Sequence, residues 1–119
     1  MSKKVALVEN DEDCREIMQY VLEEDGYEVQ AFKSYTMLNR LALYDLFIID
    51  EYSPGIRGSD VCKELKSQVN IPVILSSTGL ELYSSACACG ADTYLSKPFD
   101  IDYLRSLVKR YINLDVRHI

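Results

Sequence analysis

The stretch "DLFIID" at residues 45–50 decides the fold of this chain. Its apolar run, residues 46–49, has no alternation of polar and apolar positions, which is typical of a strand buried on both faces of a parallel sheet. Similar short apolar runs occur at residues 4–8 and 72–76. Because parallel strands must be joined by crossover connections, which are usually helices, these runs predict an α/β domain.

Segments with helical spacing of apolar residues lie between the strands. The pattern predicts helices over residues 12–24, 35–43, 59–69, 80–89 and 100–112, and further strands over residues 28–32 and 93–96. Gly26 and Gly90 are expected to end two of the helices, while Ser59 and either Asp100 or Asp102 are expected to cap two others. A strand and a helix thus alternate five times, which predicts a doubly wound sheet with helices on both faces.

The composition predicts one domain over residues 1–119, with a core at 4–112 and a short tail at 113–119. Hydrophobic residues make up 48% of the chain, enough for a core, and no apolar run reaches the roughly 18 residues of a membrane span. The net charge of -6 argues against direct nucleic-acid binding and against an anionic membrane surface. The tail is too short for an output domain, so we expect either a stand-alone module or a part of a longer protein.

Four cysteines, Cys14, Cys62, Cys87 and Cys89, are expected to be reduced, because no secretion signal is recognisable and reduced thiols are the cytosolic default. This predicts a cytoplasmic location. Cys87 and Cys89 lack the two-residue spacer of common zinc knuckles. Packing between helices is therefore the favoured role of the cysteines, and a metal–thiolate site is the alternative.

Polar side chains follow four of the predicted strands. They are Glu9, Asn10 and Asp11 after the first strand, Asp50 after the third, Ser76, Ser77 and Thr78 after the fourth, and Lys97 after the fifth. The carboxyl ends of parallel strands form the ligand edge of a doubly wound sheet. Oxygen ligands there favour Mg²⁺, and a carboxylate can accept a phosphoryl group. Asp50 is the best acceptor, with Lys97 and Ser77 to stabilise the phosphoryl oxygens.

Four motifs in this order resemble the receiver domain of bacterial response regulators. They are "ALVENDED", "DLFIIDEYSPGIRG", "PVILSST" and "GADTYLSKPF", and the resemblance extends from Lys4 to about Ile112. It implies a flavodoxin-like (βα)5 fold with strand order 2-1-3-4-5. It also implies that Asp50 takes a phosphoryl group from a histidine kinase or a phosphotransfer protein in two-component signalling.

The resemblance assigns roles to individual residues. Mg²⁺ would be held by Glu9, Asn10, Asp50 and the backbone carbonyl of Tyr52. Ser77 and Lys97 would bind the phosphoryl oxygens, and the Lys97–Pro98 bond would be cis. Tyr94 would change rotamer together with Ser77, and so pass the signal to the face formed by residues 80–89, 93–96 and 100–112.

Four of the nine tyrosines fall in this last third of the chain, Tyr83, Tyr94, Tyr103 and Tyr111. Packing of helices and sheet is their favoured role, and a homodimer or partner contact on this face is the alternative. A domain of this family is not a stand-alone enzyme, since it catalyses only its own phosphotransfer and the slow hydrolysis of its aspartyl-phosphate.

The chain departs from the family pattern at several positions. Asn10 stands where a second acid is usual, which predicts weaker Mg²⁺ binding. The intervals from Asp50 to Ser77 and from Ser77 to Lys97 are slightly short, and the helix at 80–89 has low propensity. Tyr52 and Gly79 occupy positions that tune the access of water in the family. We expect Tyr52 to slow hydrolysis and Gly79 to leave the site open.

Three other functions compete with this interpretation. A binding module of the same fold that no longer uses phosphate is favoured by Asn10. It is opposed by the intact Asp50, Ser77 and Lys97. A phosphatase with an aspartate nucleophile usually needs a second aspartate two residues later, where this chain has Tyr52. A flavodoxin-like electron carrier needs a phosphate-binding loop after the first strand, where the acids at 9–13 would repel phosphate.

Overall fold

The computed structural model describes residues 2–114 and contains one five-stranded parallel sheet. Its strands in spatial order are β2 (Glu28–Phe32), β1 (Lys4–Val8), β3 (Leu46–Asp50), β6 (Val73–Ser77) and β7 (Thr93–Ser96). The predicted doubly wound sheet and its strand order are therefore confirmed. The predicted tail lies almost wholly outside the described residues.

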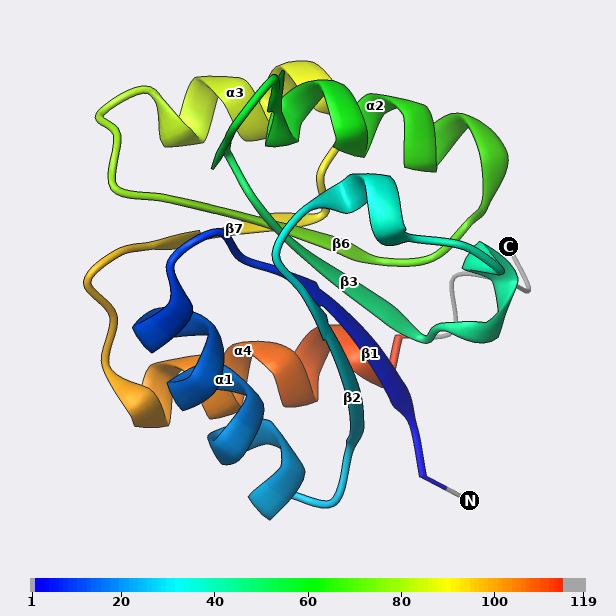
Figure 1. Ribbon diagram of the computed structural model, residues 1–119, viewed down its shortest axis with the longest axis vertical. Coiled ribbons are helices and arrows are strands. Elements are labelled where there is room, and N and C mark those ends of the chain that lie inside the picture. The colour runs from blue at the N-terminus through cyan, green and yellow to red at the C-terminus, as the bar shows by residue number, and fades with distance from the viewer. Residues whose placement is uncertain (1, 115–119) are drawn as a thin grey trace.

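Helices cover both faces of the sheet (Figure 1). α1 (Glu12–Glu24) and α4 (Ile101–Ile112) lie on one face, and α2 (Gly58–Gln68) and α3 (Leu82–Cys89) lie on the other. Successive residues of β3 point alternately into the two layers: Leu46 and Ile48 join one core cluster, whereas Phe47 and Ile49 join the other. Both faces of β3 are thus apolar, and this explains why its sequence shows no polar alternation.

The helix predicted over residues 35–43 was wrong. The segment forms two short 3-10 turns instead, Tyr35–Met37 and Leu41–Leu43, because the backbone leaves the helical path between them. Leu38 is extended, and Arg40 adopts a left-handed conformation with φ 50°. Tyr44, just after the second turn, is buried and packs its ring on Phe47 with centroids 5.5 Å apart.

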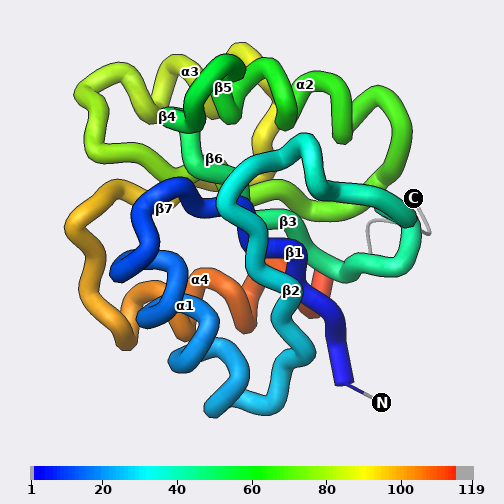
Figure 2. The backbone as a smooth tube through the Cα atoms, in the orientation of Figure 1, coloured from blue at the N-terminus to red at the C-terminus, as the bar shows by residue number. Residues whose placement is uncertain are grey.

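The loop expected after β3 contains a small antiparallel hairpin, β4 (Tyr52–Ser53) and β5 (Ile56–Arg57), beside the start of α2 (Figure 2). The prediction that Ser59 caps this helix was wrong. α2 begins at Gly58, so Ser59 already lies within its first turn, where its backbone N–H donates to Glu51 Oε1 at 2.7 Å. A carboxylate from β3's own continuation therefore takes the place of a local cap.

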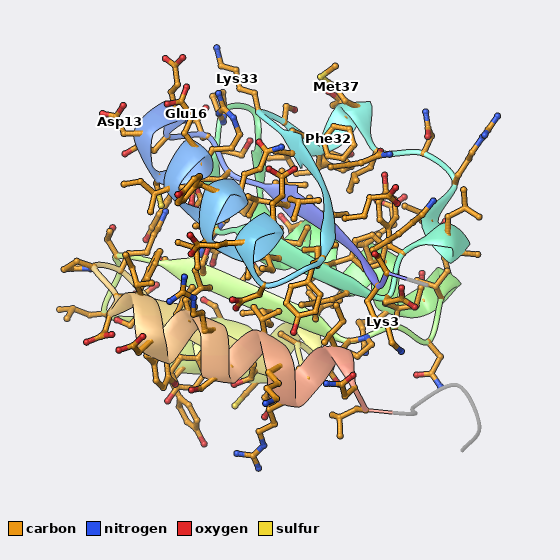
Figure 3. The ribbon with its side chains drawn as sticks, turned by 90° about the horizontal axis from the view of Figure 1, so that it is seen from below. Lys3, Asp13, Glu16, Phe32, Lys33 and Met37 are labelled. Atoms are coloured by element: carbon orange, nitrogen blue, oxygen red, sulfur yellow. The ribbon has the colours of Figure 1, made fainter. Side chains whose placement is uncertain are left out.

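The other predicted helix ends agree with the structure. Asp100 caps α4 by accepting from the Asp102 N–H, and Gly90 ends α3 in the left-handed region with φ 79°. Asp13 and Glu16 of α1 point away from the sheet (Figure 3). Within residues 2–114, no helix combines the length and the apolar character needed to cross a bilayer.

The four cysteines are all free thiols. Cys62 of α2 and Cys89 of α3 are buried where the two helices pack, and the Cys62 thiol lies 3.7 Å from the Cys89 carbonyl oxygen. Cys87 is exposed. Packing is thus the role of Cys62 and Cys89. The cytoplasmic location stays a prediction.

Candidate functional site

The register of the sheet brings the polar strand ends together. Val8 is aligned with Ile49, so that Glu9 follows β1 next to Asp50. Asp50 is aligned with Ser76, and Ser77 with Ser96. Lys97 follows Ser96, and hence all four strands deliver a polar side chain to the same edge of the sheet.

Lys97 joins the two acids of this edge. Its Nζ lies 2.9 Å from Glu9 Oε1 and 3.3 Å from Asp50 Oδ1. Glu9 is only 1% exposed and Asp50 only 4% exposed. A buried carboxylate must be paired and hydrogen-bonded to be tolerated, and here one ammonium group serves two of them.

The two acids that share the Lys97 ammonium group have pKa values shifted in opposite directions. Burial, and then the adjacent Glu9 carboxylate, raise the pKa of Asp50 to about 6. Burial would also raise the pKa of Glu9, but its hydrogen bonds with Asp50 and Lys97 lower it overall. Burial opposes the charge of Lys97, yet the two carboxylates raise its pKa. Further positive charge at this edge would therefore favour the ionised form of Asp50.

The residues after Glu9 divide between the site and α1. Asp11 is the N-cap of α1, where its side chain accepts from the N–H groups of Asp13 and Cys14. Its own N–H donates to Glu9 Oε2 at 3.1 Å. Asp11 is thus occupied as a helix cap, which leaves half-exposed Asn10 as the residue next to Glu9 that is available to the site.

The donor atoms at this edge fit a hard cation. Within the described part of the chain, no group of three or more histidine, cysteine or acidic side chains is placed to hold a metal ion. The site has two carboxylates, with the Asn10 amide beside Glu9 in the chain and the Tyr52 carbonyl two residues after Asp50. Mg²⁺ is commonly held by one or two carboxylates and keeps several waters, so this oxygen set suits it.

Tyr52 fills the space beside Gly79. A Cβ on Gly79 would lie 2.7 Å from the Tyr52 hydroxyl oxygen and 3.2 Å from Ser77 Oγ. Ser77 is buried, and its Oγ accepts from the Gly79 N–H at 2.8 Å. The phenol of Tyr52, half-exposed on β4, therefore reaches the loop after β6. The space beside Gly79 is not open, contrary to the expectation from its missing side chain.

Tyr94 lies on β7 and is partly exposed. Its ring meets the ring of Tyr83 on α3 edge-on, with centroids 5.7 Å apart. The Lys97–Pro98 bond is cis, as expected.

Glu51 is the residue that the sequence analysis missed. It follows Asp50 directly, is buried, and its carboxylate binds both Arg57 and the start of α2. An acid next to Asp50 at the end of a buried strand was visible in the sequence, but its partners depend on the hairpin that follows.

The sequence profile of the response regulator receiver domain matches residues 5–109 of this chain. The chain belongs to the response regulator receiver domain family. Sporulation initiation phosphotransferase F of Bacillus subtilis is 31% identical over 122 residues, which cover 96% of this chain and 97% of that protein. The transcriptional regulatory protein CrdR of Helicobacter pylori is 34% identical over 123 residues, covering 97% of this chain.

Some relatives of this receiver domain are much longer. The chain spans 57% of the length of CrdR and 57% of the response regulator ArlR of Staphylococcus epidermidis, to which it is 28% identical.

Solved receiver structures have the same fold. A putative response regulator from Chloroflexus aurantiacus matches with a TM-score of 0.87 and 26% identity, covering 96% of this chain and 100% of that one. The response regulator TrrA of Thermotoga maritima, solved in complex with Mg²⁺–BeF, matches with a TM-score of 0.76 and 30% identity over 92% and 98% of the two chains.

Proposed function

We propose that this receiver domain takes a phosphoryl group onto Asp50 from a histidine kinase or a phosphotransfer protein. The observation that carries the proposal is the Lys97 ammonium group between the buried carboxylates of Glu9 and Asp50, at 2.9 and 3.3 Å. A fixed cation beside a buried carboxylate is what a phosphoryl acceptor needs, because negative charge arrives on the transferred group.

In this proposal, an Asp50 carboxylate oxygen attacks the phosphorus of a phosphohistidine. A phosphorus–oxygen bond forms, the phosphorus–nitrogen bond breaks, and its electron pair leaves with the imidazole of the donor. Lys97 is placed to pair with the phosphoryl oxygens, and the Ser77 hydroxyl to donate to one of them. Asp50 must be ionised to attack, and its pKa of about 6 makes this form dominant only above that pH.

Glu9, Asn10, Asp50 and the Tyr52 carbonyl would hold Mg²⁺ here. When bound, the ion would supply positive charge that offsets the negative charge of the transferred phosphoryl group. The complex of TrrA with Mg²⁺–BeF supports the choice of Mg²⁺ as the cation.

The response would be read on the face formed by α3, β7 and α4. Tyr83, Tyr94 and Tyr103 are all exposed there. We propose that Ser77 and Tyr94 act as the switch, and that this face contacts a second copy of the chain or another protein. In this proposal the domain acts in the cytoplasm without binding nucleic acid or membrane, and its only catalysis is its own phosphotransfer and slow dephosphorylation.

Acetyl phosphate and Mg²⁺ test the proposal directly. Intact-mass measurement should show the addition of one phosphoryl group to the wild type and none to Asp50→Asn. Beryllofluoride should likewise change the NMR spectrum of the wild type only. The proposal would be wrong if the wild type were not modified, or if Asp50→Asn were still modified.

Asn10 favours a second candidate, a protein-binding module that does not depend on phosphorylation. With only two carboxylates at the site, cation binding and phosphoryl transfer could have been lost while the fold was kept. A folded wild-type chain that neither binds Mg²⁺ nor is modified by acetyl phosphate would support this candidate.

A further inference from the structure

Glu51 is a buried acid whose carboxylate has two partners on the far side of the β4–β5 hairpin. Its side chain is 3% exposed. Oε1 accepts from the Ser59 N–H at 2.7 Å, and Oε2 accepts from Arg57 Nη2 at 3.0 Å. An unpaired buried carboxylate is strongly unfavourable, so separating Glu51 from Arg57 or Ser59 would cost stability.

Backbone hydrogen bonds hold the chain on both sides of Glu51, directly after the proposed acceptor Asp50. The Gly58 N–H donates to the Glu51 carbonyl at 2.8 Å, and the Glu51 N–H donates to the Ser76 carbonyl at 2.8 Å. A Cβ on Gly58 would lie only 2.2 Å from the carbonyl oxygen of Asp50. The peptide between Asp50 and Glu51 is thus held between β6 and the first residue of α2.

The β4–β5 hairpin begins and ends next to the hydrogen-bonded residues Glu51 and Gly58. Tyr52 of β4 is paired with Arg57 of β5, and it follows Glu51 directly. The Glu51–Arg57 ion pair therefore joins the two ends of the hairpin. It lies next to Tyr52, whose carbonyl is proposed as a cation ligand. A helix cap alone would need only a hydrogen-bond acceptor for Ser59, whereas this carboxylate also binds the half-exposed guanidinium group of Arg57.

We infer that Glu51 is a positioning residue of the site: its carboxylate, by holding Arg57 and the start of α2, fixes the Tyr52 peptide beside Asp50 and so sets the affinity for a divalent cation. The inference rests on the proposed cation site and extends it to a residue that touches neither the cation nor the phosphoryl group. Groups that orient metal ligands commonly change metal affinity about tenfold or more when they are lost.

Glu51→Gln is the most direct test, because the amide oxygen can still accept from Ser59 while the ionic partner of Arg57 is gone. Mn²⁺ serves as the probe, with the free ion counted by electron paramagnetic resonance. Glu51→Gln and Arg57→Gln should each weaken Mn²⁺ binding about tenfold. Arg57→Lys should recover part of the loss, since it restores the charge without the planar guanidinium group.

Asp92→Asn is the matched control. Asp92 forms a comparable ion pair with Lys66 at 2.8 Å, but it lies at the opposite edge of the sheet, beside the first residue of β6. Urea unfolding should show that this variant loses stability, while its Mn²⁺ affinity stays at the wild-type value. Without any cation, the amide ¹⁵N shift of Tyr52 should move in Glu51→Gln and not in Asp92→Asn.

Two outcomes overturn the inference. If Glu51→Gln keeps the wild-type Mn²⁺ affinity and the wild-type Tyr52 shift, Glu51 is only a helix cap, and the proposed function stands. If the wild type itself binds no Mn²⁺ and acetyl phosphate does not modify Asp50, the proposed function fails and the role of Glu51 fails with it.

Discussion

Asp50 is an acid that the folded protein keeps protonated more readily than the unfolded chain does. Its pKa is about 6 in the fold, against an ordinary value of 3.8. Between these values the folded state holds a proton that the unfolded state has lost, so this group lowers stability as pH rises from about 4 to 6.

Asp50→Asn should therefore stabilise the domain at neutral pH. In the absence of divalent cations we expect a gain of about 1–3 kcal/mol at pH 7 over wild type, with the difference growing between pH 4 and 6 and constant above. Urea unfolding of both proteins from pH 4 to 8 measures it. A difference that does not change with pH would mean that Asp50 titrates normally.

Single residues of the site could be predicted because each lies at the carboxyl end of a predicted strand. Glu9, Asp50, Ser77 and Lys97 were found in this way, and the register brings them to one edge. Which acids bind Lys97 and which one caps α1 could not be predicted. It depends on where one flexible lysine side chain ends, and on whether Asp11 turns toward the site or, as observed, toward the N–H groups of α1.

At the scale of elements, α2 begins in direct contact with the end of β3. Gly58 permits this contact, since a Cβ there would lie 2.2 Å from one backbone atom and 2.7 Å from another, which cannot rotate away. Gly55, in the hairpin turn, has open space around it but a φ of 86°.

Gly58→Ala should cost about 2–3 kcal/mol or more, because β3 or α2 must shift to admit the methyl group. Gly55→Ala should cost about 1 kcal/mol from its backbone conformation alone. Chemical denaturation of the two variants tests the comparison. Equal losses of stability would show that α2 and β3 can separate easily.

Strands and most helices could be predicted because hydrophobic spacing reports which face is buried. The segment at 35–43 could not. Its apolar residues have helical spacing, but Arg40 takes a left-handed conformation, and the buried residue is Tyr44 beyond the pattern. The cap of α2 was missed for a related reason, since Glu51 reaches Ser59 only because the hairpin folds back between them.

Across the whole molecule, Lys97 links the end of β7 to the ends of β1 and β3. It binds Glu9 after β1 and Asp50 at the end of β3. Without it, two buried carboxyl groups would face each other with no fixed cation between them, and the pKa of Asp50 should rise further.

Lys97→Ala should leave Mg²⁺ affinity intact or higher, because the lysine and the ion compete for the same carboxylates. The spectral changes that beryllofluoride causes in β7 and α4 should be strongly reduced, since the residue that follows β7 then no longer contacts the group on Asp50. NMR titration of the Asp50 carboxyl carbon and of the β7 amides measures both effects, with Lys66→Ala as control. Lost Mg²⁺ binding together with a normal response in β7 would contradict this role.

β3 has strands on both sides and helices on both faces, and all five of its residues are buried. Its amide protons should exchange with solvent only when the whole domain unfolds, whereas those of the hairpin and of the 3-10 segment can exchange through local opening. Asp50 thus lies in the part of the protein that is expected to open last. Any rearrangement that follows a change at Asp50 must be made by the loops and helices around a stationary strand.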